Sequence, residues 1–207
     1  MKTLIKCFWV FILGSFIGCL VEEIWCLIKN KCFQIRSSLI HFPLIPIYGF
    51  AALFILIIAD KVGYSLWKIF IIGVLVATIV EYLCSYFQEK VFKTKSWDYS
   101  EFKYNLNGRV NLVYSIGFGL ISMLVIKYIK NFEIYVSGLV NNETFIRVTI
   151  FVFVLFILDV ITSSIACLRY NSRREGIVAS NNVERFLDKY YPDNRVEKIY
   201  NNSIYVG

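Results

Sequence analysis

Residues 145–168 read FIRVTIFVFVLFILDVITSSIACL, and this stretch decides the fold class of the chain. Its only charged side chains are those of Arg147 and Asp159. A helix needs about 20 consecutive apolar residues to cross ~30 Å of hydrocarbon, and this stretch supplies them. Its apolar residues follow one another instead of alternating with polar ones, which predicts a membrane helix and not a strand of a β-barrel.

Four further apolar segments lie along the chain, and charged loops separate them. Together with the stretch quoted above, the apolar segments are 4–28, 44–59, 66–87, 110–126 and 145–168. The second and fourth are short for a full crossing, so each could be tilted, thin the bilayer locally or be partly re-entrant. We predict an all-α fold, a polytopic integral membrane helical bundle of about five transmembrane helices over residues 1–168. A polar cytoplasmic tail at 169–207 follows it.

The composition supports a membrane protein. The 207-residue chain is 57% hydrophobic and 18% charged, with a mean hydropathy of +0.60. Soluble domains average roughly 45–50% apolar and about 25% charged residues. This excludes a disordered chain, a disulfide-stapled secreted domain and a simple nucleic-acid binder. The net charge of +7 indicates basic loops that face the cytoplasm and anionic lipid.

The sequence was also searched for a secretory signal and for a metal site built from cysteine and histidine. Lys2 and Lys6 precede the first apolar segment, as in a secretory signal, but apolar sequence continues to Ile28 without an A-x-A cleavage site. The six cysteines form no C-x-x-C pair, and His41 is the only histidine, so we predict free thiols packed among helices and no metal site.

Lys and Arg are unevenly divided between the two sides of the predicted bundle. With five crossings, the side of the N-terminus carries seven of the 22 basic residues and the opposite side carries fifteen. The positive-inside rule then places the N-terminus outside and the C-terminus in the cytoplasm. Within the tail, residues 182–190 predict one short helix that stops before Pro192, and we expect the tail to be a solvated, lipid-facing extension.

A short pattern indicates an internal duplication. Leu20-Val21-Glu22-Glu23-Ile24 and Ile79-Val80-Glu81-Tyr82-Leu83 share an aliphatic residue, Val, Glu, any residue and an aliphatic residue. Each is followed by a basic loop and an apolar segment that opens with a tyrosine. This predicts a parallel repeat of helical hairpins, with chance similarity between apolar helices as the alternative. Under the repeat, Glu22 and Glu81 approach each other on the first and third helices, packed side by side in one direction.

Ionisable residues inside apolar segments need an explanation, because each costs roughly 2.5–3.5 kcal/mol at a helix centre. They are Glu22, Glu23, Glu81 and Asp159, and all four fall in the predicted cytoplasmic half of the bilayer. Either they form interhelical hydrogen bonds or stay protonated, or they line a polar cavity for a substrate or ion. On the third segment Glu81, Ser85 and Glu89 share one helical face.

The loop between the third and fourth segments adds further candidates for a substrate or ion path. They are Asp98, Asn105, Asn107 and Arg109. Arg109 follows an Asn-Gly turn and begins the fourth segment, so we predict that it pairs with a carboxylate among Glu81, Glu89, Asp98 and Glu101. The alternatives are a phosphate ligand or an interfacial anchor.

Several common motifs are absent. The sequence has no G-x-x-x-x-G-K-[ST], so it does not bind ATP through a P-loop, and no G-x-G-x-x-G or H-E-x-x-H occurs. No Ser-His-Asp or Cys-His arrangement is persuasive with His41 as the only histidine. Catalytic residues therefore stay unassigned, and we expect no cofactor and no bound metal.

Taken together, a set of motifs resembles the bacterial membrane-protein family described as putative ABC-transporter type IV, or ABC transporter permease. The matching pieces are Ser15-Phe16-x-Gly18-x-x-x-Glu22, Phe33-x-x-Arg36, Pro46-Ile47-Tyr48-Gly49-Phe50, Glu81-Tyr82-x-x-Ser85-Tyr86-x-x-Glu89, Trp97-Asp98-Tyr99-Ser100, Asn105-Leu106-Asn107-Gly108-Arg109 and Asp159. The resemblance implies a permease component in the cell membrane with a separate ATPase subunit. Five short helices are few for a complete permease, so a homo-oligomer or another partner would be needed. A membrane-embedded enzyme acting on a lipid or lipid-linked substrate and a non-catalytic scaffold are the alternatives.

Overall fold

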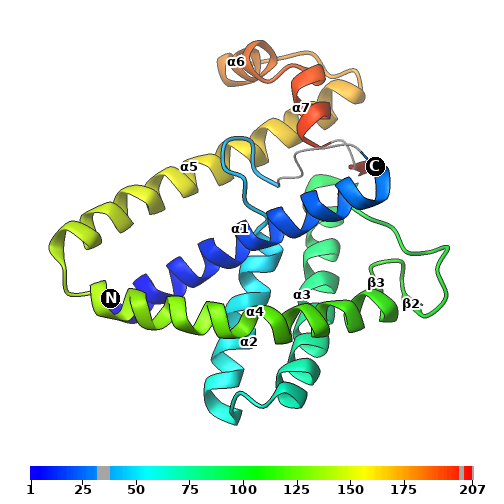
Figure 1. The fold of residues 1–207 in the computed structure, drawn as a ribbon. Helices are drawn as coiled ribbons and strands as arrows, with labels where there is room; N and C mark the ends of the chain where they lie inside the picture. The colour runs from blue at the N-terminus through cyan, green and yellow to red at the C-terminus, as the bar shows by residue number, and fades with distance from the viewer. Residues whose placement is uncertain (32–37, 201–202, 207) are drawn as a thin grey trace.

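The computed structural model describes residues 1–31, 38–200 and 203–206, so Cys32, Phe33 and Arg36 lie outside the described residues. Helices dominate these ranges (Figure 1). The helices are α1 (Lys2–Asn30), α2 (Pro46–Val62), α3 (Leu66–Phe92), α4 (Leu112–Leu139), α5 (Glu143–Arg174), α6 (Asn182–Tyr190) and α7 (Asp193–Ile199). Four two-residue strands are β1 (Thr94–Lys95), β2 (Asn105–Leu106), β3 (Val110–Asn111) and β4 (Ile204–Tyr205).

Within the described ranges, four helices are long and apolar enough to cross a membrane: α1, α3, α4 and α5. The predicted count of about five is therefore corrected to four. The difference is α2, whose 17 residues give a length of about 26 Å, short of the ~30 Å hydrocarbon core. Pro46 sets its beginning, and Gly63, with a φ of 94°, ends it.

The fourth and fifth helices are longer than the apolar segments that predicted them. The fourth segment was expected at 110–126, but α4 continues to Leu139 through Lys127, Lys130 and Glu133. Similarly, α5 passes position 168 and ends at Arg174. Charged side chains end an apolar run without breaking helical hydrogen bonding, because Lys, Arg and Glu are good helix formers.

Two close-packed hairpins, α1–α2 and α3–α4, form the centre of the bundle. In the first, a Cβ on Gly14 would lie 2.6 Å from the Cβ of Ala52 and 3.2 Å from the Cα of Gly49. In the second, a Cβ on Gly73 would lie 3.1 Å from the Cα of Gly119. Both hairpins thus rely on small residues that let two backbones approach closely.

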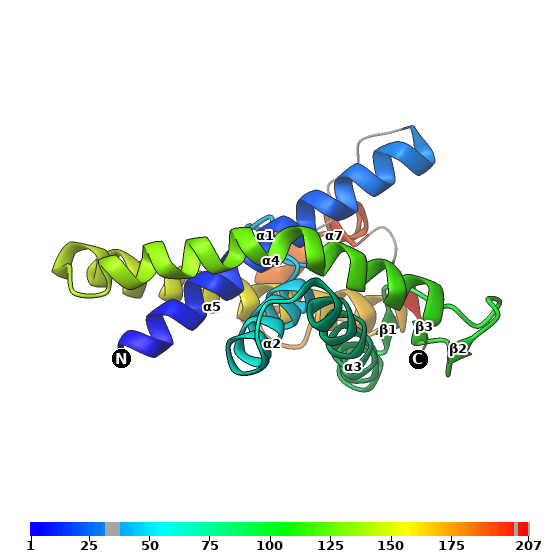
Figure 2. The ribbon, with the colours of Figure 1, turned by 60° about the horizontal axis from the view of Figure 1, so that its bottom comes forward.

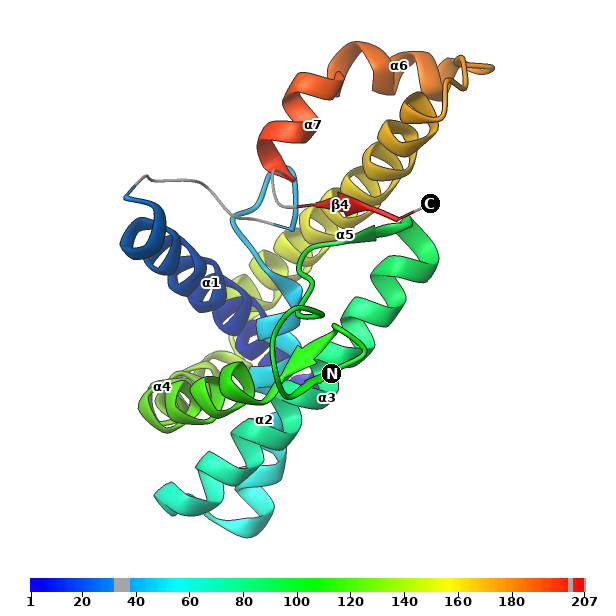
Figure 3. The ribbon, with the colours of Figure 1, turned by 90° about the vertical axis from the view of Figure 1, so that its right-hand side faces the viewer.

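The predicted side-by-side packing of the first and third helices is wrong. The main neighbours of α1 are α2 and α4, and those of α3 are α4 and α2. Helices α2 and α3 lie beside each other while α4 crosses both (Figure 2). Both α1 and α3 run toward the end of the bundle that carries α7 and β4, and they diverge as they approach it (Figure 3).

Ion pairs tie together three helix ends at the opposite end of the bundle. Lys130 of α4 lies 2.7 Å from Asp60 of α2 and 3.1 Å from Glu133, and Lys6 of α1 lies 2.8 Å from Glu133. The N-terminus, the end of α2 and the end of α4 therefore share one end of the bundle. We call it the N-terminal end, and the other the tail end.

The tail holds more regular structure than the one short helix expected of it. The predicted helix at 182–190 is confirmed as α6, capped by the Asn181 side chain and followed by Pro192. Helices α6 and α7 and the end of α5 contribute to a small apolar core. Its buried residues are Ala166, Tyr170, Leu187, Tyr191 and Val196. Strand β4 then pairs antiparallel with β1, which joins the C-terminal region to the loop after α3.

Candidate functional site

Glu22 of α1 is bound by a tyrosine from the neighbouring helix. The hydroxyl of Tyr48, in the first turn of α2, donates a hydrogen bond of 2.6 Å to Glu22 Oε1. The ring of Tyr48 lies where a side chain on Gly18 would have to be, one turn before Glu22. The sequence spacing of Gly18 and Glu22 thus creates both the space for the ring and the acceptor for its hydroxyl.

Glu81 of α3 is 6% exposed and is bound by a loop residue. The hydroxyl of Tyr99 donates a hydrogen bond of 3.2 Å to Glu81 Oε1, and the Tyr99 ring stacks on Tyr114 with centroids 4.9 Å apart. Burial, and then the charge of Glu81, raise the pKa of Tyr99 well above its usual value, so its hydroxyl stays a donor. The other oxygen, Glu81 Oε2, is buried and has no hydrogen-bond partner in the part of the chain that the structure describes.

These two pairs meet between the hairpins. Glu22 lies within electrostatic reach of Glu81, and Tyr48 lies within reach of both carboxylates. We call Glu22, Tyr48, Glu81 and Tyr99 the Glu–Tyr cluster. The sequence analysis predicted that Glu22 and Glu81 approach on packed first and third helices; the structure places them within electrostatic reach of each other, and the residue that binds Glu22 is Tyr48 of α2.

Arg109 forms the predicted ion pair, and its partner is Glu89. Arg109 Nη2 lies 2.9 Å from Glu89 Oε2, and Nη1 donates a hydrogen bond of 3.4 Å to Ser85. The guanidinium also lies over the rings of Tyr82 and Tyr86, at 5.8 and 5.4 Å from the centroids. The aromatic stripe on α3 therefore forms a platform for Arg109 beside the Glu–Tyr cluster.

The remaining loop candidates hold the loop itself. Asp98 accepts hydrogen bonds from the backbone and hydroxyl of Ser100, which lower the pKa of Asp98, and Lys95 lies 3.3 Å away. Asn105 accepts a hydrogen bond from the Gly108 backbone, and Asn107, with a φ of 54°, donates one to Tyr82. Asp98 and Asn105 thus stabilise turns within the loop, whereas Asn107 ties the loop to α3.

Asp159 lies at a separate place, where α5 meets the loop before α2. Its carboxylate, 4% exposed, accepts the backbone N–H groups of His41 at 3.2 Å and Phe42 at 2.8 Å, and the His41 ring Nδ1 lies 2.8 Å from Oδ1. The Ser163 hydroxyl lies 3.2 Å from the same oxygen. Asp159 is thus not grouped with the glutamates. Glu23, half-buried on α1, lies 3.7 Å from the Cys19 sulfur.

Sequence reasoning missed several members of these groups. Tyr48, Tyr99 and Tyr114 were noted only as parts of motifs or interfacial belts, although a tyrosine next to a buried carboxylate is a common donor. His41 was set aside because no partner was visible for it in the sequence. Glu133 was missed because the fourth segment was expected to end at 126.

The arrangement provides buried acceptors and hydroxyl donors, but few metal ligands. Within residues 1–31, 38–200 and 203–206, no group of three or more His, Cys, Asp or Glu side chains is placed to hold a metal ion. Among the same residues, no Lys or Arg forms an ion pair with Glu81. The Glu–Tyr cluster can therefore accept a proton or a hydrogen-bond donor at Glu81 Oε2.

The fold and these buried polar groups define a multi-pass helical membrane protein of a transport-related kind. Residues 9–164 match the family model described as "Putative ABC-transporter type IV", and the chain belongs to that family. The match covers α3 and α4 completely and most of α1 and α5, and it includes both the Glu–Tyr cluster and Asp159. Comparisons with curated proteins and with solved structures gave no match.

Proposed function

We propose that this chain is the permease component of a transport system, and that the Glu–Tyr cluster contacts the transported substrate or ion. The observation that carries the proposal is the buried Glu81 Oε2, which has no hydrogen-bond partner among the described residues although Glu81 lies within electrostatic reach of a second carboxylate. A buried acceptor without a partner costs about 1–3 kcal/mol, a cost that a transiently bound donor would offset. Ionisable groups of this kind in membrane helices mark substrate and proton pathways.

The proposal includes orientation and partners. We propose that the tail end faces the cytoplasm, because the loops and tail gathered there carry most of the basic residues. The cluster then lies in the cytoplasmic half of the bilayer.

ATP would be bound by a separate ATPase subunit, since the chain has no P-loop. Four spans are few for a complete pathway, which supports assembly as a homo-oligomer in the cell membrane.

Water access to the cluster tests its place in a transport path. In a cysteine-free background, Glu81→Cys should react with a charged methanethiosulfonate reagent added from the cytoplasmic side of membrane vesicles. The matched control is Leu83→Cys, two residues away on the exposed face of α3, which lipid should shield. Equal reactivity of the two, or reactivity of neither, would contradict a polar path at Glu81.

Solute flux tests the activity itself. Cells that produce the parent chain together with the proposed ATPase subunit should differ from cells without them in the content of at least one solute, measured by mass spectrometry. Glu81→Gln should abolish that difference while leaving the amount of folded protein unchanged, and Glu101→Gln, an exposed loop carboxylate, should preserve it. If cells with the parent protein and cells without it have the same content of every solute, the permease assignment is wrong.

A further inference from the structure

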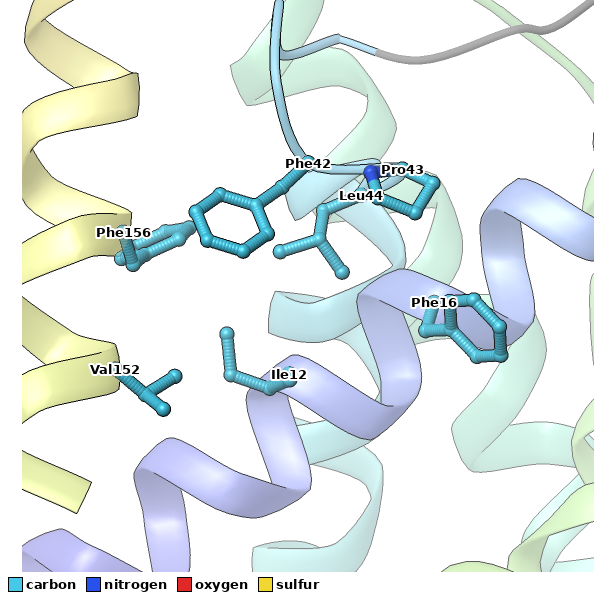
Figure 4. A pocket seen from close by; sticks show the side chains of 7 residues that line it. All are labelled: Ile12, Phe16, Phe42, Pro43, Leu44, Val152 and Phe156. Atoms are coloured by element: carbon cyan, nitrogen blue, oxygen red, sulfur yellow. The ribbon is translucent and has the colours of Figure 1, made fainter. Parts of the chain in front are cut away.

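An apolar crevice lies between α1 and α5, outside the Glu–Tyr cluster. It has a volume of about 200 Å³ and is lined by Ile12, Phe16, Phe42, Pro43, Leu44, Val152 and Phe156. Figure 4 shows Ile12 and Val152 on either side of the gap, with Phe42, Leu44 and Phe156 together at one end of it. All of these side chains are apolar, so the crevice offers nothing to an ion or a polar solute.

The position of the crevice indicates what surrounds it. Its two helical walls, α1 and α5, are both long and apolar enough to cross a membrane. On α5, the residues that flank the crevice, Phe153 and Val154, are each 48% exposed. Edge-to-face contacts of Phe8 on α1 with Phe153 and Phe156 on α5 hold the two walls together. Hydrocarbon chains of the bilayer are therefore the molecules next to the opening.

A polar group sits at the tail end of the crevice. Phe42, which lines it, donates its backbone N–H to Asp159, and Phe156 precedes Asp159 by one turn of α5. Asp159 also fixes the His41 ring through Nδ1, and the other ring nitrogen, Nε2, lies 3.4 Å from the Tyr191 hydroxyl. The His41 side chain is 49% exposed. It is therefore oriented by a buried carboxylate yet open to a ligand.

We propose that this crevice binds one bilayer glycerophospholipid, with an acyl chain between Ile12 and Val152 and the headgroup at His41. The direction of the site matches that of a lipid in the tail-end leaflet. From His41 and Asp159 the apolar wall runs toward Val152, away from the basic end of α5 at Arg169 and Arg173. His41 Nε2 can exchange its long 3.4 Å contact with the Tyr191 hydroxyl for a headgroup oxygen, and the acyl chain fills the gap by van der Waals contact with the apolar side chains that line it.

A photoactivatable lipid tests the site. The purified chain is placed in nanodiscs of phosphatidylethanolamine and phosphatidylglycerol that contain a phospholipid with a diazirine in mid-chain, irradiated, and mapped by peptide mass spectrometry. Label should concentrate on Ile12 and Val152 relative to the exposed Val154. Val152→Trp fills the gap and excludes the acyl chain by direct overlap, so labelling of Ile12 should fall about tenfold.

Val154→Trp is the matched control, at the same depth on the exposed face, and should leave the labelling of Ile12 unchanged. Ile12→Trp fills the gap from the other wall and replaces Val152→Trp if that variant does not fold, as judged by size-exclusion chromatography. His41→Ala should reduce labelling by the phospholipid probe but not by a diazirine hydrocarbon that lacks a headgroup. Uniform labelling of all exposed faces, unaffected by either tryptophan, or equal effects of His41→Ala on both probes, would overturn the proposal.

Discussion

Glu81 and Asp159 are both almost fully buried, yet their carboxylates are satisfied to different degrees. Asp159 receives two backbone N–H groups, an imidazole and a hydroxyl, whereas Glu81 receives one tyrosine hydroxyl. A carboxylate with several donors fixes structure, because removing it leaves several backbone groups unpaired. A carboxylate with an unmatched oxygen is instead suited to exchanging a proton or ligand. Burial alone does not separate these two roles; the number of donors does.

At the same scale, Arg109→Ala should lower the thermal stability of the protein. The substitution leaves Glu89 with Lys95 at 3.9 Å as its remaining cation and uncovers the Tyr82 and Tyr86 rings. We expect a loss of about 1–3 kcal/mol, below the value for a fully buried pair, because the Glu89 side chain keeps some contact with water. Fluorescence-detected size-exclusion chromatography after heating measures it.

Arg109→Lys should recover only part of the loss, because an ammonium cannot span Glu89 and Ser85 with the planar fork of a guanidinium. Lys90→Ala is the control, since Lys90 is exposed and lies only near the Tyr86 ring, at 5.9 Å. If Arg109→Ala has the same melting temperature as the parent protein, the Arg109–Glu89 pair does not contribute to stability.

At the scale of elements, hairpin packing depends on glycines at helix contacts, and these can be told from glycines that face open space. Gly49 of α2 faces α1, where a Cβ would lie 2.6 Å from the Phe11 carbonyl oxygen and clash with the Ser15 hydroxyl. Gly117 of α4 has no heavy atom within 4 Å of such a Cβ. Two substitutions of the same kind should therefore have opposite effects.

Gly49→Ala should destabilise the protein by about 1–3 kcal/mol, because the contact is with backbone that cannot easily move. Gly117→Ala should be neutral or slightly stabilising, since Ala is favoured over Gly in a helix by up to ~1 kcal/mol. Melting temperatures of the two variants beside the parent decide the matter. A Gly49→Ala protein as stable as Gly117→Ala would show that the α1–α2 contact is looser than described.

The contact of α5 with α6 should depend on pH. Arg169 Nε and Nη2 each donate a hydrogen bond of 2.8 Å to Asp188, and Arg173 adds another. Pairing with Arg169, and next with Arg173, lowers the pKa of Asp188 to about 2. Because the folded-state pKa lies below the ordinary value of 3.8, the pair stabilises the docked tail above about pH 4 and is lost as pH falls toward about 2.

Pepsin, which is active in this acid range, can measure the change. Cleavage of the tail should accelerate as pH falls from about 4 to 2, beyond the change in pepsin activity on a reference peptide. Asp188→Asn should give rapid cleavage already at pH 4, whereas Asp193→Asn, which removes a more exposed partner of Arg173, should resemble the parent. A parent profile that follows the reference peptide throughout would exclude the Asp188 contact as the cause.

At the scale of the whole molecule, the helix ends and the two termini gather at two opposite ends of the bundle. This arrangement predicts a membrane topology that reporter fusions can test. The N-terminus and the Val140–Asn142 loop lie at the N-terminal end, whereas the β1–β4 pair holds the C-terminal region at the tail end. Short as it is, α2 returns the chain between these ends from inside the bundle. Because α2, although too short to count as a span by itself, carries the chain back as a fifth pass within the bundle, the two termini should lie on opposite sides of the membrane.

Under the proposed orientation, green fluorescent protein fused at the C-terminus should fluoresce, and alkaline phosphatase in the 140–142 loop should be active. Each reporter is also placed at the other site as the control, where it should be silent. Active phosphatase at the C-terminus would reverse the orientation. Activity of the same reporter at both sites would contradict the grouping of the ends.

The sequence by itself determined the class of protein and several local features. Long apolar runs predicted α1, α3 and α5, because crossing hydrocarbon is a requirement that a single segment must meet alone. The helix at 182–190 was readable from its own residues and the following proline. The pair formed by Arg109 was also predictable, since a charge at a membrane interface needs a partner and the adjoining helix supplied one.

Only the tertiary structure decided which buried groups meet. His41 and Asp159 are 118 residues apart, and the tail joins the loop after α3 through β1 and β4. The residue that binds Glu22 is Tyr48 of α2, and Glu81 lies within electrostatic reach of both. The physical reason is that each apolar segment spans the bilayer by its own length, independently of the rest of the chain. The donor to a buried carboxylate is set instead by which helices and loops the whole bundle brings together.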